Sequence, residues 1–196
     1  YQRIWTRDGA FRRATVGAAN GVSSGMNWVA SKIDVLASAA SGNPGYGRAD
    51  TMRNLYISLK GALDKKRPDL PEDKREAFAR LMAAQAMHES GNGQSKLARE
   101  ANNYGGVIAI KDKPVYNCVD NSTGKMSRWA KFDSMQDWAD FHVSLLGGQR
   151  YGMFDTDPTD YVHTLKTGGY FEASEGSYAS AIQKHLGQVN TVMGGP

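Results

Sequence analysis

Glu89 is the residue whose surroundings suggest chemistry most directly, because it ends an apolar stretch and precedes a glycine-rich turn. Its carboxylate would stand at the C-terminal end of a helix, where the partial negative charge of the backbone makes an anion unfavourable. Together with apolar neighbours this raises the pKa expected for Glu89, as a general acid requires to protonate a leaving oxygen near neutral pH. Gly91 and Gly93 would let a substrate approach the backbone closely. The alternative is that Glu89 is a solvated last-turn residue and that the glycines only end the helix.

The other side chains able to do chemistry form no such pattern. The single cysteine, Cys118, excludes an internal disulfide framework and has no identifiable catalytic histidine partner. His142, His163 and His185 fall in three separate predicted helices without the spacing of metal ligands. His88 directly precedes Glu89 and so points about 100° away around the helix, as a packing or surface residue. We therefore expect no metal ion and no cofactor.

The elements that must position Glu89 are mostly helical. Apolar residues recur at helical spacing after residue 49, with capping residues and breakers between the segments. The stretch 107–132 differs, because Val, Ile, Tyr and Trp flank Asn121-Ser122-Thr123-Gly124, a pattern typical of a β-hairpin. The expected helices are 49–67, 71–91 with Pro71 in its first turn, one capped by Ser134, one from Asp157-Pro158 to Gly168, and one from Ser177 to Gly187. The predicted fold class is therefore α+β, mainly α, with one small sheet.

The chain has 196 residues, enough for one domain of ordinary size. Glycines and Asn43-Pro44 punctuate the first part, so residues 1–48 are interpreted as a leader or linker with a short helix over 28–36. Residues 49–190 form the expected functional domain, and 191–196 a tail. The leader suggests a domain excised from a larger protein. No apolar run approaches the ~20 residues of a membrane-spanning helix.

The net charge of the chain indicates which classes of binding partner to expect. Lys and Arg exceed Asp and Glu by 24 to 20, which gives a net charge of +4. A modest positive charge favours anionic partners in general. A nucleic-acid-binding module would carry a basic stripe with interleaved aromatic residues, whereas the Lys and Arg residues are scattered here. We therefore expect no nucleic-acid partner.

A wider motif surrounds Glu89 and continues downstream. Its members are Gln85-Ala86, Glu89-Ser90-Gly91, Gly93, Ser95, Asn102-Asn103-Tyr104-Gly105, Lys131-Phe132-Asp133-Ser134, Gly168-Gly169-Tyr170 and Tyr178-Ala179. In combination they resemble the signature of the bacterial endo-β-N-acetylglucosaminidases of glycoside hydrolase family 73, which includes flagellar muralytic proteins and autolysins. The resemblance extends from about Phe78 to Leu186 and does not cover the leader. It implies a lysozyme-like helical domain in which the β-hairpin forms one wall of the cleft.

The resemblance also implies catalytic roles. Glu89 would be the general acid, and Tyr178 would stand opposite it and hold or polarise the N-acetyl group of the sugar. The family often carries a second glutamate on the hairpin, and this chain has none between residues 107 and 132. The hairpin candidates are Asp112 and Asp120, and Asp120 is preferred because it precedes the turn on the equivalent arm. An ordinary turn role for Asp120, and assistance by the substrate's own acetamido group, stay open.

Five further residues are assigned to substrate binding: Ser90, Gly91, Asn103, Tyr104 and Trp129. Asn103 and Tyr104 match the asparagine–aromatic pair of the family, although an asparagine can also bond a helix end and a tyrosine can pack. Trp129 would offer an aromatic platform to a sugar, or would lie in the core. Asn92 stands where the family usually has an aromatic residue between the glycines, so the identity of one sugar subsite is in question.

The expected function is hydrolysis of β-1,4 glycosidic bonds in peptidoglycan, whose strands alternate GlcNAc and MurNAc. The enzyme would act in the periplasm or outside the cell, reached by export, injection or lysis, as a monomer without a membrane span. Two alternatives stay open beside the endo-β-N-acetylglucosaminidase. One is a muramidase or lytic transglycosylase on the same fold, and the other is a non-catalytic wall-binding or assembly module.

Overall fold

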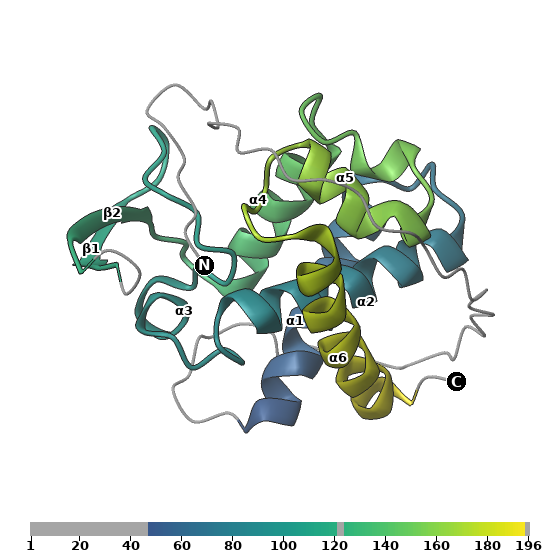
Figure 1. Cartoon of the computed structure of the whole chain (residues 1–196), viewed down its shortest axis with the longest axis horizontal. Helices are drawn as coiled ribbons and strands as arrows, with labels where there is room; N and C mark the ends of the chain where they lie inside the picture. Colours follow the sequence, from purple (N-terminus) through teal and green to yellow (C-terminus); the bar gives the residue numbers. More distant parts are fainter. Residues whose placement is uncertain (1–46, 121–123, 195–196) are drawn as a thin grey trace.

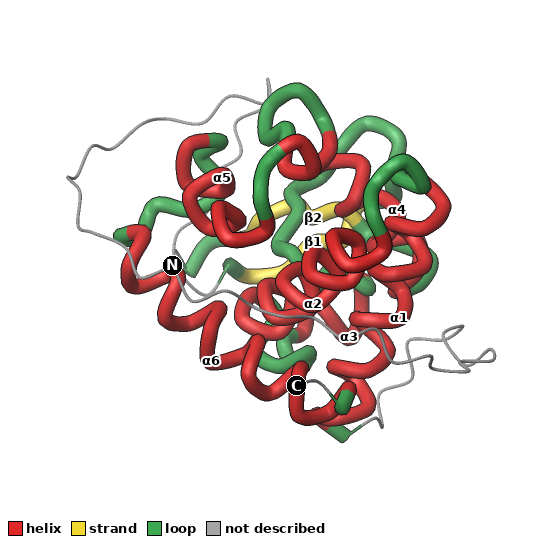
Figure 2. The backbone as a smooth tube through the Cα atoms, turned by 90° about the vertical axis from the view of Figure 1, so that its right-hand side faces the viewer, coloured by secondary structure: helices red, strands yellow, loops and turns green. Residues whose placement is uncertain are grey.

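The computed structural model describes residues 47–120 and 124–194. The helices are α1 (Arg48–Lys66), α2 (Glu72–Glu89), α3 (Lys96–Ala101), α4 (Met135–Gly147), α5 (Tyr161–Thr167) and α6 (Glu175–Met193), with 3₁₀ helices η1 (Met153–Asp155) and η2 (Pro158–Asp160). Strands β1 (Val115–Val119) and β2 (Met126–Ala130) form one small antiparallel sheet among the helices (Figure 2). The predicted mainly helical α+β class is therefore confirmed. The leader with its predicted helix, and residues 121–123 of the hairpin turn, lie outside the described residues.

Helix α2 is the centre of the fold. It packs against α1 and α6, and α1 also packs against α4 (Figure 1). Residues 77–87 of α2 are all buried except Leu81, which is partly buried, and many of them are alanines. Small side chains on several faces let neighbouring helices approach closely, and a helix that is apolar all round must lie inside the protein. The helix that ends in Glu89 is thereby held by packing on more than one side.

The predicted β-hairpin lies within residues 107–132, as expected. Strands β1 and β2 stand at one side of the molecule, away from α5 and α6 (Figure 1). The preceding segment extends the sheet, because Ile108 forms an antiparallel bridge with Trp129. The Ala130 N–H donates to the Val107 carbonyl at 3.0 Å. The segment that leads into the hairpin therefore bonds to the end of β2 and holds it in place.

Several helix starts follow the capping residues read from the sequence. The Ser134 side chain accepts a hydrogen bond from the Asp137 N–H at 3.1 Å and caps α4. Asp157 caps the 3₁₀ turn η2, and α5 begins only at Tyr161. Pro71 is the N-cap residue of α2 and not a first-turn residue, so that prediction was one position out.

The predicted bounds of the last helix are wrong. Helix α6 begins after an N-cap at Ser174, whose hydroxyl accepts a hydrogen bond from the Ser177 N–H at 3.3 Å. The helix continues through Gly187 to Met193, which is buried. The continued apolar face outweighs the roughly 1 kcal/mol that glycine costs inside a helix. The last turn thus takes in residues 191–193, which the sequence analysis assigns to a tail.

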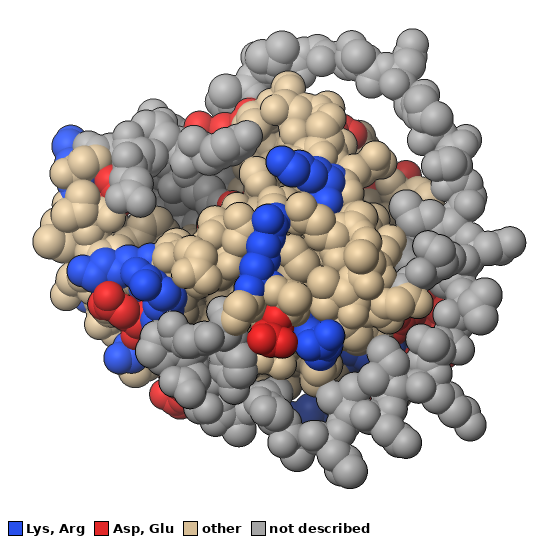
Figure 3. Space-filling view, turned by 90° about the horizontal axis from the view of Figure 1, so that it is seen from below, with Lys and Arg blue, Asp and Glu red and all other residues tan. Residues whose placement is uncertain are grey.

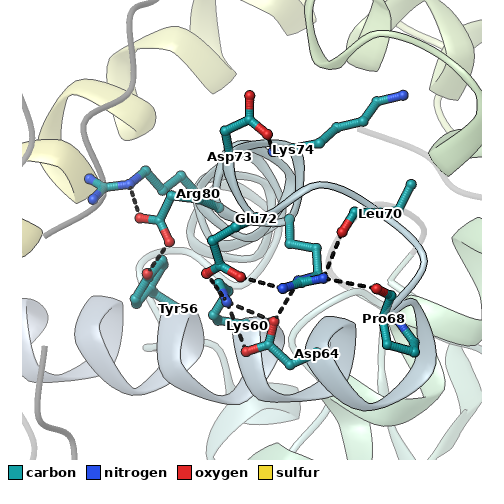
Figure 4. A network of polar contacts seen from close by, with 11 residues as sticks. Tyr56, Lys60, Asp64, Pro68, Leu70, Glu72, Asp73, Lys74 and Arg80 are labelled. Carbon is teal, nitrogen blue, oxygen red and sulfur yellow. Dashed lines mark hydrogen bonds and ion pairs between the residues drawn. The ribbon is translucent and has the colours of Figure 1, made fainter. Parts of the chain in front are cut away.

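Polar contacts tie the start of α2 to α1 (Figure 4). Lys60 Nζ lies 2.7 Å from a carboxylate oxygen of Asp64 and 2.7 Å from one of Glu72. Arg75 Nε lies 2.8 Å from Asp64 Oδ1, and its guanidinium also donates to the Leu70 carbonyl at 2.6 Å. Exposed ion pairs contribute only about 0–1 kcal/mol each. The network therefore fixes how the two helices sit, while buried packing supplies most of the stability.

A second polar group links three helices through Glu76. The Tyr56 hydroxyl of α1 donates to Glu76 Oε2 at 2.5 Å, and Arg80 Nε donates to Glu76 Oε1 at 2.7 Å. Arg80 is buried and also donates to Asn190 Oδ1 on α6 at 3.2 Å. Burial, followed by the neighbouring Glu76, raises the pKa of Tyr56, so the phenol stays a donor. These bonds hold α1 and α6 on α2 at a fixed rotation.

Within the described part of the chain, no helix combines the length and the apolar character that a membrane crossing requires.

Gly187 provides a test of why α6 continues. A Cβ placed there meets no atom within 4 Å. We expect Gly187→Ala to raise the free energy of unfolding by about 0.5–1 kcal/mol, because alanine loses less backbone entropy in a helix. Thermal unfolding should then shift upward by roughly 2–4 °C per kcal/mol.

The matched control is Gly168→Ala at the end of α5. A Cβ there would lie 2.3 Å from Tyr151 Cδ1, so this variant should melt well below wild type. A Gly187→Ala variant that also melts below wild type would contradict a continuous α6.

Candidate active site

Glu89 is the last residue of α2, and the chain leaves the helix through a left-handed turn. Gly91, Asn92 and Gly93 have φ angles of 58°, 62° and 76°. Glycine adopts this region without steric cost, and asparagine visits it more readily than most L residues. The Asn92 N–H donates to the Met87 carbonyl at 2.7 Å and so satisfies one of the last carbonyls of the helix. The left-handed backbone that follows Glu89 thus explains why glycine stands at positions 91 and 93.

Two further contacts hold this turn. A Cβ on Gly93 would lie 2.6 Å from Thr51 Cγ2 on α1, so the backbone passes too close for any side chain. The buried Ser90 hydroxyl donates to the Ala86 carbonyl at 2.6 Å and accepts from the Gly93 N–H at 2.8 Å. The geometry therefore gives Ser90 a positioning role in place of the predicted substrate contact. The turn leads into α3, a short helix that the sequence analysis does not predict.

Tyr178, near the start of α6, is in direct contact with Glu89. Its hydroxyl donates to Glu89 Oε1 at 2.6 Å. The Tyr178 ring is 1% exposed and stacks on Phe171, with ring centroids 3.8 Å apart and planes 8° apart. Glu89 itself is partly exposed. The bond shows that Tyr178 acts on Glu89, and its predicted contact with the N-acetyl group of a sugar stays a prediction.

Three buried residues that the sequence analysis does not assign to the site stand behind this pair. Gln85 Nε2 donates to the Tyr178 hydroxyl oxygen at 3.3 Å. Gln85 Oε1 accepts from the Tyr161 hydroxyl on α5 at 2.5 Å and lies 3.3 Å from His142 Nε2 on α4. Burial raises the pKa of Tyr161 far above its ordinary value, so this phenol keeps its proton. The spacing from Gln85 to Glu89 indicates a shared helix face, but nothing in the sequence points to the partners on α4 and α5.

Three of the predicted sugar-binding residues are buried in or next to the hairpin. The buried Asn103 amide donates to two backbone carbonyls at the hairpin base, at 2.8 and 2.9 Å, and its Oδ1 accepts a backbone N–H at 2.9 Å. Tyr104 packs edge-on against Trp138, and desolvation raises the pKa of Tyr104 to about 12. Trp129 is 9% exposed in β2. All three side chains are buried and the Asn103 amide bonds the backbone on both its nitrogen and its oxygen, so the structure gives them roles inside the protein, and their contact with a sugar stays a prediction.

The two other predicted site residues, Gly91 and Asp120, are at least partly exposed. Gly91 is exposed, and a Cβ on it meets no atom within 4 Å, so there is free space at this position, two residues after Glu89. Asp120 follows β1 at the far end of the hairpin and is partly exposed. Its N–H donates to the Lys125 carbonyl at 2.8 Å, and its own carbonyl accepts from the Gly124 N–H at 2.8 Å. The backbone of Asp120 therefore closes the hairpin turn. A catalytic role for its side chain stays a prediction.

The histidines next to Glu89 pack against its neighbours. His88 lies edge-on to Tyr178, with ring centroids 5.4 Å apart, and 5.9 Å from the His185 ring. Burial is the main cause that lowers the pKa of His185, so its neutral form prevails at neutral pH. Across residues 47–120 and 124–194, no group of three or more His, Cys, Asp or Glu side chains is arranged to hold a metal ion.

A cavity of about 680 Å³ lies elsewhere, between the start of α2, the η2–α5 segment and α6. Pro71, Tyr161 and Ile182 are among the residues that line it, and none of the predicted site residues does. Along α2 the cavity lining extends from Pro71 to Leu81, which lies eight residues before Glu89, or roughly 12 Å along the helix axis. We therefore place the candidate active site at the turn after Glu89 and not in this cavity.

Known proteins share the fold and part of the sequence. Residues 72–191 match the glucosaminidase family, described as mannosyl-glycoprotein endo-beta-N-acetylglucosaminidase. The fold is similar to the glycoside hydrolase domain of Salmonella typhimurium FlgJ, with a TM-score of 0.57 and 22% identity over 76% of this chain and 91% of that one. A peptidoglycan hydrolase from Sphingomonas sp. A1 gives 0.58 and 19% over 74% and 92%. The catalytic domain of the autolysin Auto from Listeria monocytogenes gives 0.55 and 19% over 81% and 90%. No curated protein sequence matches the chain.

The left-handed turn predicts different costs at its two glycines. Any side chain at Gly91 or Gly93 pays roughly 1–2 kcal/mol for the positive φ. Gly93→Ala also forces a methyl group against Thr51, and overpacking of this kind costs about 1–3 kcal/mol more. We expect Gly93→Ala to lower the free energy of unfolding clearly more than Gly91→Ala, as measured by urea unfolding of both variants. Equal losses would show that the turn does not press on α1.

Proposed function

The chain belongs to the glucosaminidase family of glycoside hydrolases, which matches it over residues 72–191, and from this premise we propose that it hydrolyses the glycan strands of peptidoglycan with Glu89 as the general acid. The family resemblance read from the residues around Glu89 is thereby confirmed. Peptidoglycan is the substrate named for the Sphingomonas enzyme of the same fold, and the Listeria relative is an autolysin. Both likenesses support the choice of polymer.

The observation that carries the proposal is the short hydrogen bond between Tyr178 and Glu89. At 2.6 Å it holds one carboxyl oxygen in place, while Glu89 is partly exposed and free space lies beside Gly91, two residues further along the chain. A glycosidase needs a carboxylic acid that protonates the glycosidic oxygen as the bond to the anomeric carbon breaks. Glu89 would transfer its proton to that oxygen, the leaving sugar would depart as an alcohol, and water would complete the hydrolysis at the anomeric carbon.

The group that activates the water, or that stabilises the sugar cation, is the second part of the proposal. We assign it to Asp120 on the hairpin, which faces solvent in part and lies on a different element from Glu89. An inverting enzyme separates its two carboxyl groups by roughly 6.5–9.5 Å, and a retaining one by roughly 5–5.5 Å. The alternative is assistance by the acetamido group of the substrate, which needs no second carboxylate.

The bond that is cut and the place of action complete the proposal. An endo-β-N-acetylglucosaminidase leaves GlcNAc at the new reducing end, a muramidase leaves MurNAc, and a lytic transglycosylase leaves an anhydro sugar. We favour the first because of the family. Mass spectrometry of the released fragments distinguishes all three. Peptidoglycan lies outside the cytoplasmic membrane, so the enzyme would act in the periplasm or outside the cell. Residues 49–190 would form the catalytic unit, and residues 1–48 would be a leader that takes no part in catalysis.

The surface charge agrees with a wall polymer that carries acidic peptides. The net charge is +4, and Figure 3 shows Lys and Arg in separate groups on the face that it views. Separate groups do not make the continuous basic stripe that nucleic-acid binding uses. Weak attraction to an anionic polymer should concentrate the enzyme on it and fall as salt rises.

Replacement of Glu89 tests the general acid. Glu89→Gln keeps the shape of the side chain and removes the transferable proton, so release of soluble fragments from purified sacculi should fall by about 10²–10⁴-fold. Glu175→Gln is the matched control, because Glu175 is an exposed glutamate that pairs with His163. A Glu89→Gln variant that keeps more than a tenth of the wild-type rate would exclude the assignment. Binding to sacculi without hydrolysis by wild type would favour the non-catalytic wall-binding module.

Replacement of Asp120 decides between the two routes for water. If Asp120 acts as base or nucleophile, Asp120→Asn should lower kcat by about 10²-fold or more, while Asp112→Asn, at an exposed aspartate before β1, should stay near wild type. Steady-state rates on soluble glycan fragments measure both variants. An Asp120→Asn variant within about threefold of wild type would reject Asp120 and leave the acetamido route.

A further inference from the structure

We propose that Gln85 is a positioning residue that fixes the direction of the hydrogen bond between Tyr178 and Glu89, and thereby selects Glu89 Oε2 as the oxygen that carries the transferable proton. The inference rests on the proposed role of Glu89 as general acid. It goes beyond that role by assigning the oxygen that reacts and the buried residues that choose it.

The orientation of the Gln85 amide follows from its two ends. Its Oε1 lies 2.5 Å from the Tyr161 hydroxyl, a separation at the short limit of O–H···O bonds and too short for N–H···O bonds. The end that faces Tyr161 is therefore the carbonyl oxygen. The amide nitrogen then faces Tyr178, at 3.3 Å from its hydroxyl oxygen.

The amide orientation determines where the Tyr178 proton points. A phenol has one proton, and its oxygen can accept. Because Gln85 Nε2 donates to the Tyr178 oxygen, the Tyr178 proton must point elsewhere, and Glu89 Oε1 lies 2.6 Å away. A flipped amide would present Oε1 to Tyr178 and would compete with Glu89 for the same proton. The side chain of Gln85 thus decides whether the bond to Glu89 exists.

The consequence for catalysis lies on the carboxyl group of Glu89. Oε1 of Glu89 accepts the proton of the Tyr178 hydroxyl, so Oε1 cannot also point a proton of its own at Tyr178. We therefore assign the acidic proton of Glu89 to its other oxygen, Oε2. A single oxygen, held in a fixed position, then donates the proton to the glycosidic oxygen, and such fixed geometry favours the reaction. Gln85 acts one helical turn before Glu89, without touching the substrate, through Tyr178.

The first test does not depend on activity. Because Gln85 Oε1 faces His142 Nε2 at 3.3 Å, neutral His142 must carry its proton on Nε2. Nitrogen NMR of the histidine rings at pH 8 should show this tautomer in wild type, and Gln85→Met should change the His142 signal. A neutral His142 with its proton on Nδ1 would mean a flipped amide and would overturn the proposal, whether or not the protein hydrolyses peptidoglycan.

The second test is a double-mutant cycle on soluble glycan fragments. Gln85→Met keeps the length of the side chain and should lower kcat by about 10- to 100-fold, the effect of a misplaced catalytic group, with KM nearly unchanged. If Gln85 acts through Tyr178, the same substitution should cost less than about twofold in a Tyr178→Phe background. Equal fold-losses in both backgrounds would reduce Gln85 to a packing residue.

A matched variant separates positioning from general destabilisation. Gln136 is a partly buried glutamine on α4 that donates to the Ser58 carbonyl at 3.2 Å. Gln136→Met should keep kcat near wild type, and thermal unfolding of each variant shows which ones fold. If Gln85→Met does not fold, Tyr161→Phe gives the same comparison, because it removes the 2.5 Å bond that orients the amide. A Tyr161→Phe variant with wild-type kcat and an unchanged His142 signal would overturn the proposal.

Discussion

The arrangement depends on a carboxylate held at the C-terminal end of a buried helix. Such a position is unfavourable for an anion, because the last carbonyls of the helix point toward it. The Tyr178 hydroxyl offsets this with a 2.6 Å hydrogen bond from a helix that lies 89 positions later in the chain. Gln85 supports the phenol in turn. Glu89, Tyr178 and Gln85 thus each have a buried hydrogen-bond partner, and such bonds restrict the side chains that form them.

The rest of the fold can be understood as support for this chain of bonds. Alanines let α1 and α6 approach α2, and Arg80 with Glu76 sets the rotation of these helices about one another. The left-handed turn then brings the backbone at Gly93 against Thr51 of α1 and leaves open space beside Gly91. The same few residues therefore end the helix, pack on its neighbour and leave free space at Gly91.

At the hairpin, residue type alone does not reveal where a side chain lies. Asn103, Tyr104 and Trp129 are of the kinds that bind sugars, but here the asparagine amide satisfies backbone groups at the hairpin base and the aromatic rings pack inside. The sequence carries no signal for this difference, because an amide that bonds a backbone carbonyl and one that bonds a hydroxyl look the same in the chain. The end of α6 was misjudged for a related reason, since a glycine stops a helix only where no buried face continues beyond it.

The sequence by itself determined the local features: the helical periods, the caps at Ser134 and Asp157, the hairpin, and Glu89 before a glycine turn. These depend on interactions within a few residues, which spacing and composition encode. The family resemblance already placed Tyr178 opposite Glu89, and only the tertiary structure decided which side chains stand behind that pair. Gln85, Tyr161 and His142 come together there from α2, α5 and α4. Contacts between helices so far apart in the chain are fixed by how whole faces pack, and no local pattern records that packing.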